Sequence, residues 1–536
     1  MRRLCVALLA LCLAAGLAAG CSLPLPGSQA PDAGEPAAEA PAAAPPRGAP
    51  EQYGGVLVAA ISGDPVTLDP AYAVTVLDCR LMALIYNGLV RFDERGQVVP
   101  DLAKEWKQSP DGLTFTFTLN RGVRFHNGRE LTAADVVYSL ERLRDPKTAS
   151  PRAWLLRDVA EISADGKYAL RIRLKEPFAP LLSLLAMPAA YIVDRNEVER
   201  YNDPTVYGLN PVGTGPFRLT GIKPNDAVTF TAFEDYFAGR PFLDGVTFHV
   251  MRDGEMAWSA FETGNLHLVD VPSAIAKRCL ASDKYRALAT VRPDLTVYYV
   301  AMNCERPPFD DVRVRQALNY AVDCAAIVKS YLPGQAEPAE GPIPPGVEGR
   351  TAQSNPYRCD QAKARALLKE AGYKGDRTLA LIFRGSRNSI VDAIVAALGK
   401  VGVKVKAVGL DREGFFRAVS EGDFDLAWLS WTADYPEASD FLWPTFHSAN
   451  KGDGGNRARF ADPQIDALIE RAIATADANE RLALYREIEV RVMNEAPWIP
   501  MYYPTVVTVC QPEVQGWKPY LIPMTDKMEN VWLKKK

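Results

Sequence analysis

Apolar and polar positions along residues 379–428 alternate between a period typical of strands and a period typical of helices. Short apolar runs predict strands over 379–384 and 403–408 and around Trp428, and amphipathic stretches predict helices over 390–401 and 412–420. A strand–helix–strand–helix–strand order is typical of an α/β lobe, in which helices cover the faces of a sheet. Ligands of such open sheets bind beyond the strand ends, so the loops that follow these strands are candidate binding loops.

The first half of the chain carries clear strand patterns and one well-marked helix start. Residues 114–119 read Thr-Phe-Thr-Phe-Thr-Leu, a period of two that predicts a strand with one buried face. Thr132, with Asp135 three residues later, predicts the N-cap of a helix that runs to about Arg144. Further strands are expected at 55–60, 102–106 and 168–174, an extended segment at 123–127, and further helices at 77–89, 317–328 and 363–371.

Two long strand-like runs, 295–303 and 501–509, stand apart from these short elements. We expect them to be the paired crossing strands of a hinge between two lobes. The segment Gly213-Thr214-Gly215-Pro216 lacks the third glycine of a dinucleotide-binding loop, and a proline stands where the helix of such a loop would begin. It predicts a turn in which glycine supplies a permissive backbone.

Residues 1–20 have the pattern of a secretory signal peptide. Arg2 and Arg3 precede an apolar run that is too short to span a bilayer comfortably, and small residues follow it. The end of this segment, Leu-Ala-Ala-Gly-Cys, resembles a bacterial lipobox, in which the cysteine, here Cys21, is lipidated and becomes the mature N-terminus. Residues 21–52 are rich in Pro and Ala, which predicts a disordered tether between the lipid anchor and a folded body.

Composition and motifs exclude several classes of protein. The formal net charge is −4, which does not resemble the basic footprint of a nucleic-acid-binding protein. No second apolar run is long enough to be a transmembrane helix. The chain contains no G-x-S-x-G, H-E-x-x-H or Cys–His signature, so no enzymatic activity is expected. A surface lipoprotein hydrolase is the alternative from a different class.

The cysteines and histidines do not form a recognisable metal site. Outside the predicted signal peptide and Cys21 there are six cysteines, namely Cys79, Cys279, Cys304, Cys324, Cys359 and Cys510. Disulfides and scattered buried thiols are both open, because six cysteines allow fifteen pairings and no spacing here selects one. The four histidines, His126, His249, His267 and His447, lack paired metal-ligand spacing. We therefore expect neither a metal nor a cofactor.

The segment from Phe424 to Asp440 contains the strongest candidate binding residue. Its first half alternates as a short strand, and a turn rich in acids and containing proline then places Asp434 at a strand exit, between Trp431 and Tyr435. Aromatic walls exclude water and strengthen a charge pair, so this carboxylate suits a positively charged ligand group. A surface turn in which the aspartate merely caps the next segment is the alternative.

A second loop offers the opposite charge. Arg384 and Arg387 follow another predicted strand of the same lobe, so they and Asp434 could face a common cleft. This arrangement suits a zwitterionic ligand, such as a peptide with an ammonium group at one end and a carboxylate at the other.

Five segments in a fixed order resemble one family. They are LAKEWKQSPDGLTFTFTLNRGVRFHNGRELTAADVVYSLERL (102–143), NPVGTGPFRL (210–219), PPFDDVRVRQALNYAVDCAAIV (307–328), DQAKARALLKEAGY (360–373) and DFDLAWLSWTADYPEASDFL (423–442). Together they are similar to the extracytoplasmic solute-binding proteins of family 5, the peptide- and nickel-type binding proteins of ABC importers. The resemblance covers essentially residues 55–536.

The resemblance implies roles for individual residues. In peptide-binding members the acid that matches Asp434, within the Trp-x-x-Asp pattern, holds the α-ammonium of the peptide, and the aromatic residue that matches Trp431 lines a side-chain pocket. Arg384 and Arg387 correspond to carboxylate contacts only by their loop position. Thr432 stands where one oligopeptide-binding relative has a cysteine, so a bridge at that point is not expected.

The resemblance also implies a fold and a role. The expected fold is α/β, a two-lobe periplasmic-binding-protein type of class II with an extra subdomain and two crossing strands. The expected limits are 53–294 for lobe I with a subdomain at about 90–190, 295–503 for lobe II, and 504–536 for the return to lobe I. The expected role is an extracytoplasmic, membrane-anchored monomer that captures peptides and delivers them to an ABC-type permease. The alternatives are a nickel chelate, haem, glutathione or an oligosaccharide as ligand, or a peptide sensor.

Overall fold

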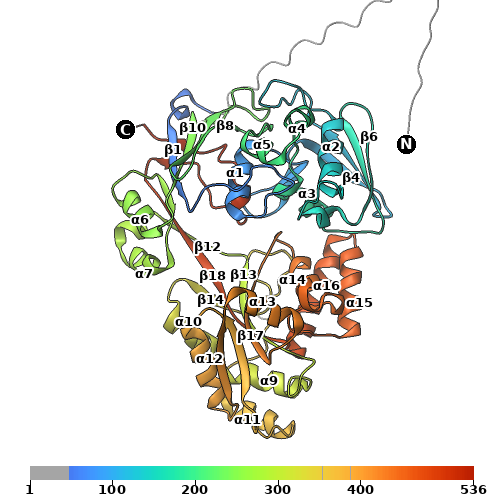
Figure 1. Ribbon diagram of the computed structural model, residues 1–536, viewed down its shortest axis with the longest axis vertical. Coiled ribbons are helices and arrows are strands. Elements are labelled where there is room, and N and C mark those ends of the chain that lie inside the picture. Colours follow the sequence, from blue (N-terminus) through green and yellow to red (C-terminus); the bar gives the residue numbers. More distant parts are fainter. Residues whose placement is uncertain (1–47, 353, 387, 536) are drawn as a thin grey trace, which may run out of the picture. The chain divides into compact units, whose positions relative to one another are not determined.

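The computed structural model describes residues 48–352, 354–386 and 388–535 (Figure 1). The predicted signal peptide, the predicted lipidation site Cys21, almost all of the predicted tether, and Arg387 lie outside the described residues. The main sheet has the strand order β16-β15-β17-β13-β18-β11-β1-β10-β9-β8. The strands from β11 to β8 in this order belong to lobe I, and those from β16 to β13 belong to lobe II.

The sheet of lobe I contains β1, which corresponds to the strand predicted at 55–60. Its strands are β1 (Val56–Ile61), β8 (Phe217–Lys223), β9 (Ala227–Ala232), β10 (Gly245–Val250) and β11 (Leu268–Asp270). Its helices are α1 (Val76–Ile85), α4 (Arg195–Tyr201), α5 (Pro204–Leu209), α6 (Gly254–Glu262), α7 (Ser273–Ala281) and α8 (Asp283–Arg286). The apolar face of α1, including Leu81 and Met82, packs with Leu57 of β1 and Phe248 of β10 in one buried core.

A subdomain of lobe I is an antiparallel sheet covered by a helix. Its strands, in the order β4-β5-β7-β6, are β4 (Ala103–Gln108), β5 (Thr114–Leu119), β7 (Ala169–Leu174) and β6 (Val159–Ala164). The period of two in β5 is confirmed, because Phe115, Phe117 and Leu119 are buried and the threonines that alternate with them are half-buried. The short strands β2 (Val90–Phe92) and β3 (Val98–Pro100) and the helices α2 (Ala133–Arg144) and α3 (Leu181–Leu185) complete it.

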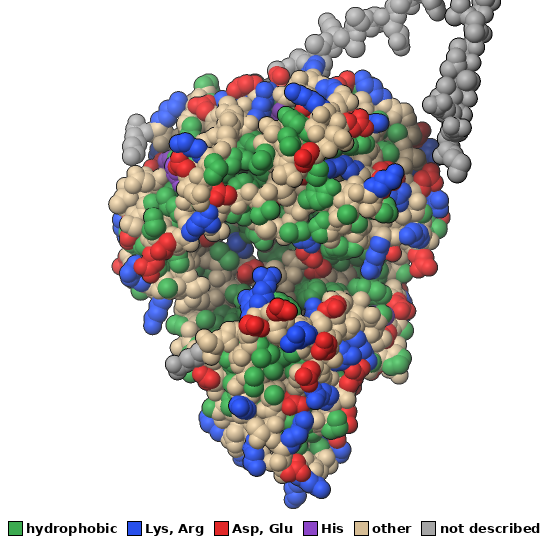
Figure 2. Space-filling model, in the orientation of Figure 1, with side chains coloured by type: hydrophobic (Ala, Val, Ile, Leu, Met, Phe, Trp, Pro, Cys, Tyr) green, Lys and Arg blue, Asp and Glu red, His purple; other side chains and the backbone are tan. Residues whose placement is uncertain are grey.

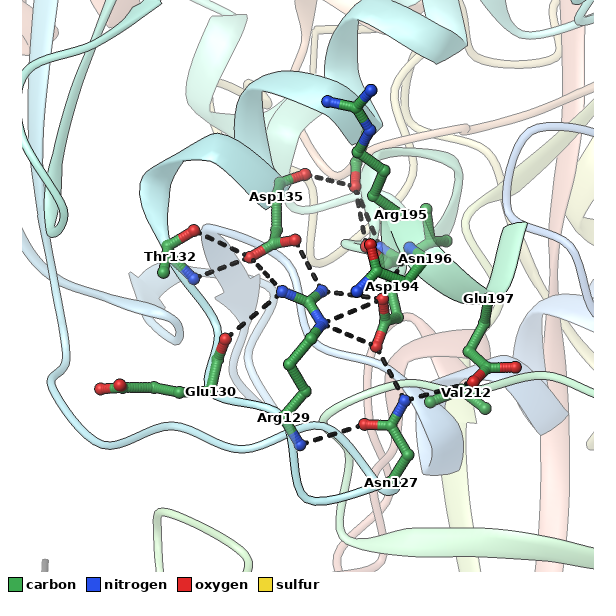
Figure 3. A network of polar contacts seen from close by, with 12 residues as sticks. Asn127, Arg129, Glu130, Thr132, Asp135, Asp194, Arg195, Asn196, Glu197 and Val212 are labelled. Carbon is green, nitrogen blue, oxygen red and sulfur yellow. Dashed lines mark hydrogen bonds and ion pairs between the residues drawn. The ribbon is translucent and has the colours of Figure 1, made fainter. Parts of the chain in front are cut away.

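The predicted start of α2 is confirmed as a capping box. The side chain of Asp135 accepts hydrogen bonds from the backbone N–H of Thr132 (2.9 Å) and from its hydroxyl group (3.0 Å). Arg129 lies against the same carboxylate and also donates three hydrogen bonds to Asp194, the N-cap of α4 (Figure 3). Both aspartates are almost fully buried, and the single positive charge of Arg129 is shared between these two acids at two helix starts.

Lobe II contains the strand–helix rhythm predicted from the sequence. The elements β15 (Leu379–Arg384), α12 (Ser389–Gly399), β16 (Val405–Leu410), α13 (Arg412–Glu421) and β17 (Leu426–Thr432) follow one another, and β15 pairs in parallel with β16 and β17. The helices α9 (Val312–Ala321), α10 (Cys324–Tyr331) and α11 (Gln361–Glu370) also belong to lobe II, and α14 (Ser439–Phe446), α15 (Pro463–Ala474) and α16 (Ala478–Glu495) pack together to one side of it (Figure 1).

One prediction about local structure was wrong. The helix expected at 317–328 is two helices, because the chain breaks at Val322 and Asp323 begins a new helix by accepting a hydrogen bond from the N–H of Ala326. The segment 123–127, expected to be extended, makes an isolated bridge from Arg124 to Glu130. Local hydrophobic periodicity did not reveal the helix break at Val322, because a capping side chain decides it.

The glycines of the Gly213–Pro216 turn are needed for a different reason from the one predicted. Neither Gly213 nor Gly215 has a positive φ angle. Instead both lie against the C-terminal end of α1, where the N–H of Gly215 donates to the carbonyl of Ile85 at 2.7 Å. A Cβ atom on Gly213 would be 2.1 Å from that carbonyl oxygen. Close backbone approach, and not conformational freedom, therefore requires glycine here.

The strand β18 (Trp498–Cys510) takes part in the sheets of both lobes. Its first half pairs with β13 (Thr296–Met302) of lobe II, so the two long runs singled out in the sequence do pair. Its second half pairs with β12 (Ala289–Pro293) and β11 on the side of lobe I, and β14 (Ala336–Pro338) pairs with its middle. The chain therefore passes between the lobes in two adjacent antiparallel strands. The exact limits predicted for the lobes stay a prediction.

The six cysteines of the described residues are free thiols. Cys79 and Cys279 are buried, and Cys304, Cys324 and Cys510 are half-buried. Of the two alternatives left open by the sequence, the described part of the chain therefore follows the one with unpaired thiols.

One buried carboxyl group in lobe II makes stability depend on pH. Glu489 of α16 is fully buried and accepts hydrogen bonds from Ser354 Oγ (2.8 Å) and the N–H of Thr351 (2.6 Å). Burial raises the pKa of Glu489 to about 7. The native state thus binds this proton more tightly than the unfolded state. Its contribution to stability is complete below the ordinary glutamate pKa of about 4.3 and is lost as the pH rises through about 7.

We expect the free energy of unfolding to fall between pH 5 and pH 8, and Glu489→Gln to reduce that fall by on the order of 2 kcal/mol. Urea unfolding at both pH values measures the effect. Glu487→Gln is the matched control, because Glu487 lies on the same helix in an exposed pair with Arg491. Equal pH dependence of the wild type and both variants would contradict the expectation.

Candidate functional site

The turn after β17 holds Asp434 in a defined position. The strand ends at Thr432, and the hydroxyl groups of Thr432 and Thr296 lie 2.8 Å apart. The N–H of Ala433 donates to the carbonyl of Leu295 at 2.8 Å. The strand exit predicted for Asp434 is therefore present, and it is tied to the start of β13, where the chain enters lobe II.

The buried side chain and backbone of Asp440 hold this turn through hydrogen bonds. Asp440, at the start of α14, accepts a hydrogen bond from the N–H of Asp434 at 2.7 Å, and its backbone carbonyl accepts one from Trp431 Nε1 at 2.8 Å. Asp440 is only 5 % exposed. Burial, and then the nearby charge of Asp434, raise the pKa of Asp440 well above its ordinary value. Asp440 therefore positions the backbone of the turn, whereas the carboxylate of Asp434 stays partly exposed to solvent.

An arginine from the subdomain meets the carboxylate of Asp434. Arg152, just before the short 3₁₀ segment Ala153–Leu156, donates from Nη1 to Asp434 Oδ1 at 3.3 Å. The side chains are 21 % and 37 % exposed respectively, so solvent reaches both. Sequence reasoning missed Arg152, which lies 282 residues from Asp434 in a segment without any motif.

The pair lies where the subdomain and lobe II meet. The N–H of Ala179 donates to the carbonyl of Ile473 at 2.9 Å, and the guanidinium of Arg157 lies 5.8 Å from the centre of the Trp443 ring. Figure 2 shows a hollow between the upper and lower parts of the molecule, with hydrophobic side chains gathered above it and charged side chains on its lower rim. Two bodies that enclose a hollow can hold a ligand between them.

The first turn of α1 lies close to the same pair. Burial raises the pKa of the Cys79 thiol to about 12, and the charges of Arg152 and Asp434 both act on this thiol. Val76, one helical turn earlier, is 64 % exposed. The region beside the two charges therefore also offers apolar surface to a ligand.

Among the other residues predicted to bind the ligand, those that the structure describes range from buried to exposed. Tyr435 is 7 % exposed and its hydroxyl group lies 3.1 Å from Ser439 Oγ, so most of the ring is inside lobe II. Trp431 is half-buried, with its ring edge against Gly455. Arg384 is exposed at the end of β15, and Arg387 lies outside the described residues. The roles predicted for these residues in ligand binding stay predictions.

Arg384 is not brought next to Asp434. The register pairs Ile382 of β15 with Ala427 of β17, which puts Arg384 level with Leu429. Asp434 lies five residues farther along, or about 16 Å at the rise of an extended strand. A ligand that contacts both groups would have to extend over several residues.

Neither a metal site nor a membrane-spanning helix is found in the described part of the chain. No group of three or more His, Cys, Asp or Glu side chains there could hold a metal ion. Nor is any helix there long and apolar enough to cross a bilayer.

The model of the bacterial extracellular solute-binding proteins, family 5, matches residues 97–453, which include the subdomain and most of lobe II with the Asp434 turn. The chain belongs to this family. The α/β fold with two lobes and the family resemblance predicted from the sequence are thereby confirmed.

Relatives within family 5 are named after different ligands. The chain is 32 % identical to the glutathione-binding protein GsiB of Pectobacterium atrosepticum over 481 residues, which is 87 % of this chain and 92 % of that protein. It is 32 % identical to heme-binding protein A of Haemophilus influenzae over 464 residues, with coverages of 81 % and 84 %. Among solved structures, DppA of Helicobacter pylori in complex with the peptide STSA has a TM-score of 0.74 and 27 % identity, covering 90 % of this chain and 99 % of that one.

Proposed function

We propose that this family 5 protein captures peptides with a free amino terminus between its lobes and delivers them to the permease of an ABC importer. The observation that carries the proposal is the carboxylate of Asp434, which a rigid turn presents at the junction of the two lobes with only one hydrogen-bond partner among the described residues. An ammonium group is the complementary ligand group, because a carboxylate in a partly desolvated site pairs strongly with a cation.

The remaining parts of the proposal concern the protein's setting. The lipobox-like sequence at Cys21 supports a lipid-anchored protein on the outer side of a cell membrane, held by the Pro- and Ala-rich tether. We propose that the body acts as a monomer and has no catalytic activity, since a binding protein for a permease needs only to close and open around its ligand. Trp431, Tyr435, Arg384 and Arg387 are proposed contacts for peptide side chains and the carboxyl end.

Glutathione is the second candidate ligand. Two features favour it, namely the 32 % identity to a glutathione-binding protein and the presence of a cation, Arg152, beside Asp434. Glutathione carries an ammonium group and two carboxylates, and a site with both charges suits it better than a site with a carboxylate alone.

Native mass spectrometry of the purified protein, followed by denaturation and identification of the released compound, tests the class of ligand directly. Calorimetric titration then compares a free tripeptide with its N-acetylated form. We expect the acetylated peptide to bind at least about tenfold more weakly, because acetylation removes the charge that pairs with Asp434. Equal affinities would remove the ammonium from the proposal.

A further inference from the structure

The contact between Arg152 and Asp434 differs from the Arg–Asp pairs of lobe I in which the aspartate is buried. Arg142 donates two hydrogen bonds to Asp69, at 2.8 and 2.6 Å, and Asp69 is fully buried. Arg129 likewise uses its whole guanidinium fork on buried acids. Those pairs are closed, because both oxygens of each buried carboxylate already accept hydrogen bonds from the arginine.

The pair of Arg152 and Asp434 is open by comparison. A single contact of 3.3 Å joins the two groups, and the guanidinium makes no other hydrogen bond to the residues that the structure describes. A guanidinium has five N–H donors and a carboxylate has two acceptor oxygens, so most donors of Arg152 and Oδ2 of Asp434 remain available to a ligand. Both side chains also keep part of their surface in solvent.

Both groups are held on fixed backbone. The N–H of Arg152 donates to Ser150 Oγ at 3.1 Å, and the hydroxyl group of Ser150 donates to the carbonyl of Ala71 at 2.5 Å. On the other side, Asp440 and Leu295 hold the turn of Asp434. Preorganised charges of opposite sign, a few ångströms apart, match a ligand in which the two complementary charges are equally close.

We infer that Arg152 and Asp434 together bind an α-amino-acid head group in which the ammonium and the carboxylate on the same carbon are both free. The ammonium would pair with Asp434 and the carboxylate with the unused donors of Arg152, while the contact between the two residues persists. A γ-glutamyl peptide has such a head group. The first residue of an ordinary α-linked peptide does not, because its carboxyl group is part of the peptide bond.

This inference rests on the proposed function, since it assigns the chemistry of one end of the captured ligand. An α-linked peptide would offer Arg152 a neutral carbonyl oxygen, whereas a γ-linked one offers a carboxylate. Hydrogen bonds between two charged groups are markedly stronger than those to a neutral acceptor. The site therefore selects between two peptides of the same composition by the position of one bond.

The test is calorimetric titration of two tripeptides, γ-Glu-Cys-Gly in its reduced form and α-linked Glu-Cys-Gly. The proteins are the wild type, Arg152→Gln, Asp434→Asn and the control Arg157→Gln. Arg157 suits this purpose because it lies five residues from Arg152, also reaches lobe II through Trp443, and does not touch Asp434. Thermal unfolding of each variant checks that it is folded.

We expect the wild type and Arg157→Gln to bind the γ-linked peptide about tenfold more tightly than the α-linked one. In Arg152→Gln this preference should disappear, because only the γ-linked peptide should bind more weakly. Asp434→Asn should weaken the binding of both peptides. Equal binding of the two peptides by the wild type would overturn the inference, as would tighter binding of both by Arg152→Gln, which would make Arg152 a competitor of the ligand. In either case a weakening of both peptides by Asp434→Asn would leave the proposed function standing. Unchanged binding by Asp434→Asn would count against that function itself.

Discussion

Replacing Asp434 with asparagine is expected to weaken the binding of a free-amino peptide by about 2–5 kcal/mol, the range found when one partner of a desolvated charge pair is truncated. Asparagine keeps the shape of the side chain and the backbone hydrogen bond to Asp440, so the turn should survive. The change removes only the negative charge that pairs with the ammonium. Calorimetric titration with one peptide and the two proteins measures the loss.

Asp423→Asn is the matched control for this experiment. Asp423 precedes the same strand, and its exposed side chain pairs with Arg306 at 3.3 Å on the far side of lobe II from the turn. Its replacement removes one negative charge from the lobe without changing the site, and we expect wild-type affinity. If Asp434→Asn bound the peptide as tightly as this control, Asp434 would not be the ammonium contact.

Replacing Arg129 with methionine is expected to lower the free energy of unfolding by about 3–5 kcal/mol, because it leaves two buried carboxylates without their cation. Asp194 is 0 % exposed and Asp135 is 4 % exposed, and each sits at the start of a helix (Figure 3). The guanidinium carbon of Arg129 lies 4.6 Å from the centre of the Phe125 ring, and methionine fills part of that space, so the lost charge dominates. Urea unfolding followed by tryptophan fluorescence gives the change.

Arg195→Gln serves as the control for Arg129. Figure 3 shows the guanidinium of Arg195 pointing away from the network, and its partner is the exposed Glu199 one helical turn later. Exposed pairs of this kind contribute less than about 1 kcal/mol. A loss of similar size in both variants would show that the two buried aspartates do not depend on Arg129.

The local elements of lobe II could be predicted because each one carries its own signal. The N-terminal Asn388 cap and the apolar face of α12 are consecutive in the chain, as are the alternating residues of β17. The predicted helix at 317–328 was wrong because Asp323 offers a side-chain cap inside an unbroken apolar pattern. A periodicity cannot report that break, whereas the capping hydrogen bond does.

Only the Asp434 part of the candidate site could be predicted from the sequence. Asp434 follows a strand and stands in a family motif, so local pattern and resemblance both pointed to it. The position of Arg384 relative to Asp434 could not be predicted, since two parallel strands can end at the same edge while their last residues differ in height. Strand register depends on side chains from both strands and from the helices above them.

By itself the sequence determined most of the order of the elements and the family, and it singled out Asp434 as the carboxylate that we propose for a ligand's amino group. All of these depend on neighbours within a few residues or on motifs in a fixed order. Only the tertiary structure decided that Arg152 meets Asp434, that Asp440 supports the turn, and that Gly213 and Gly215 are required by contact with α1. Each of these contacts depends on how separately folded elements pack together. Arg152 and Asp434 belong to different parts of the fold, and no pattern in either segment encodes the other.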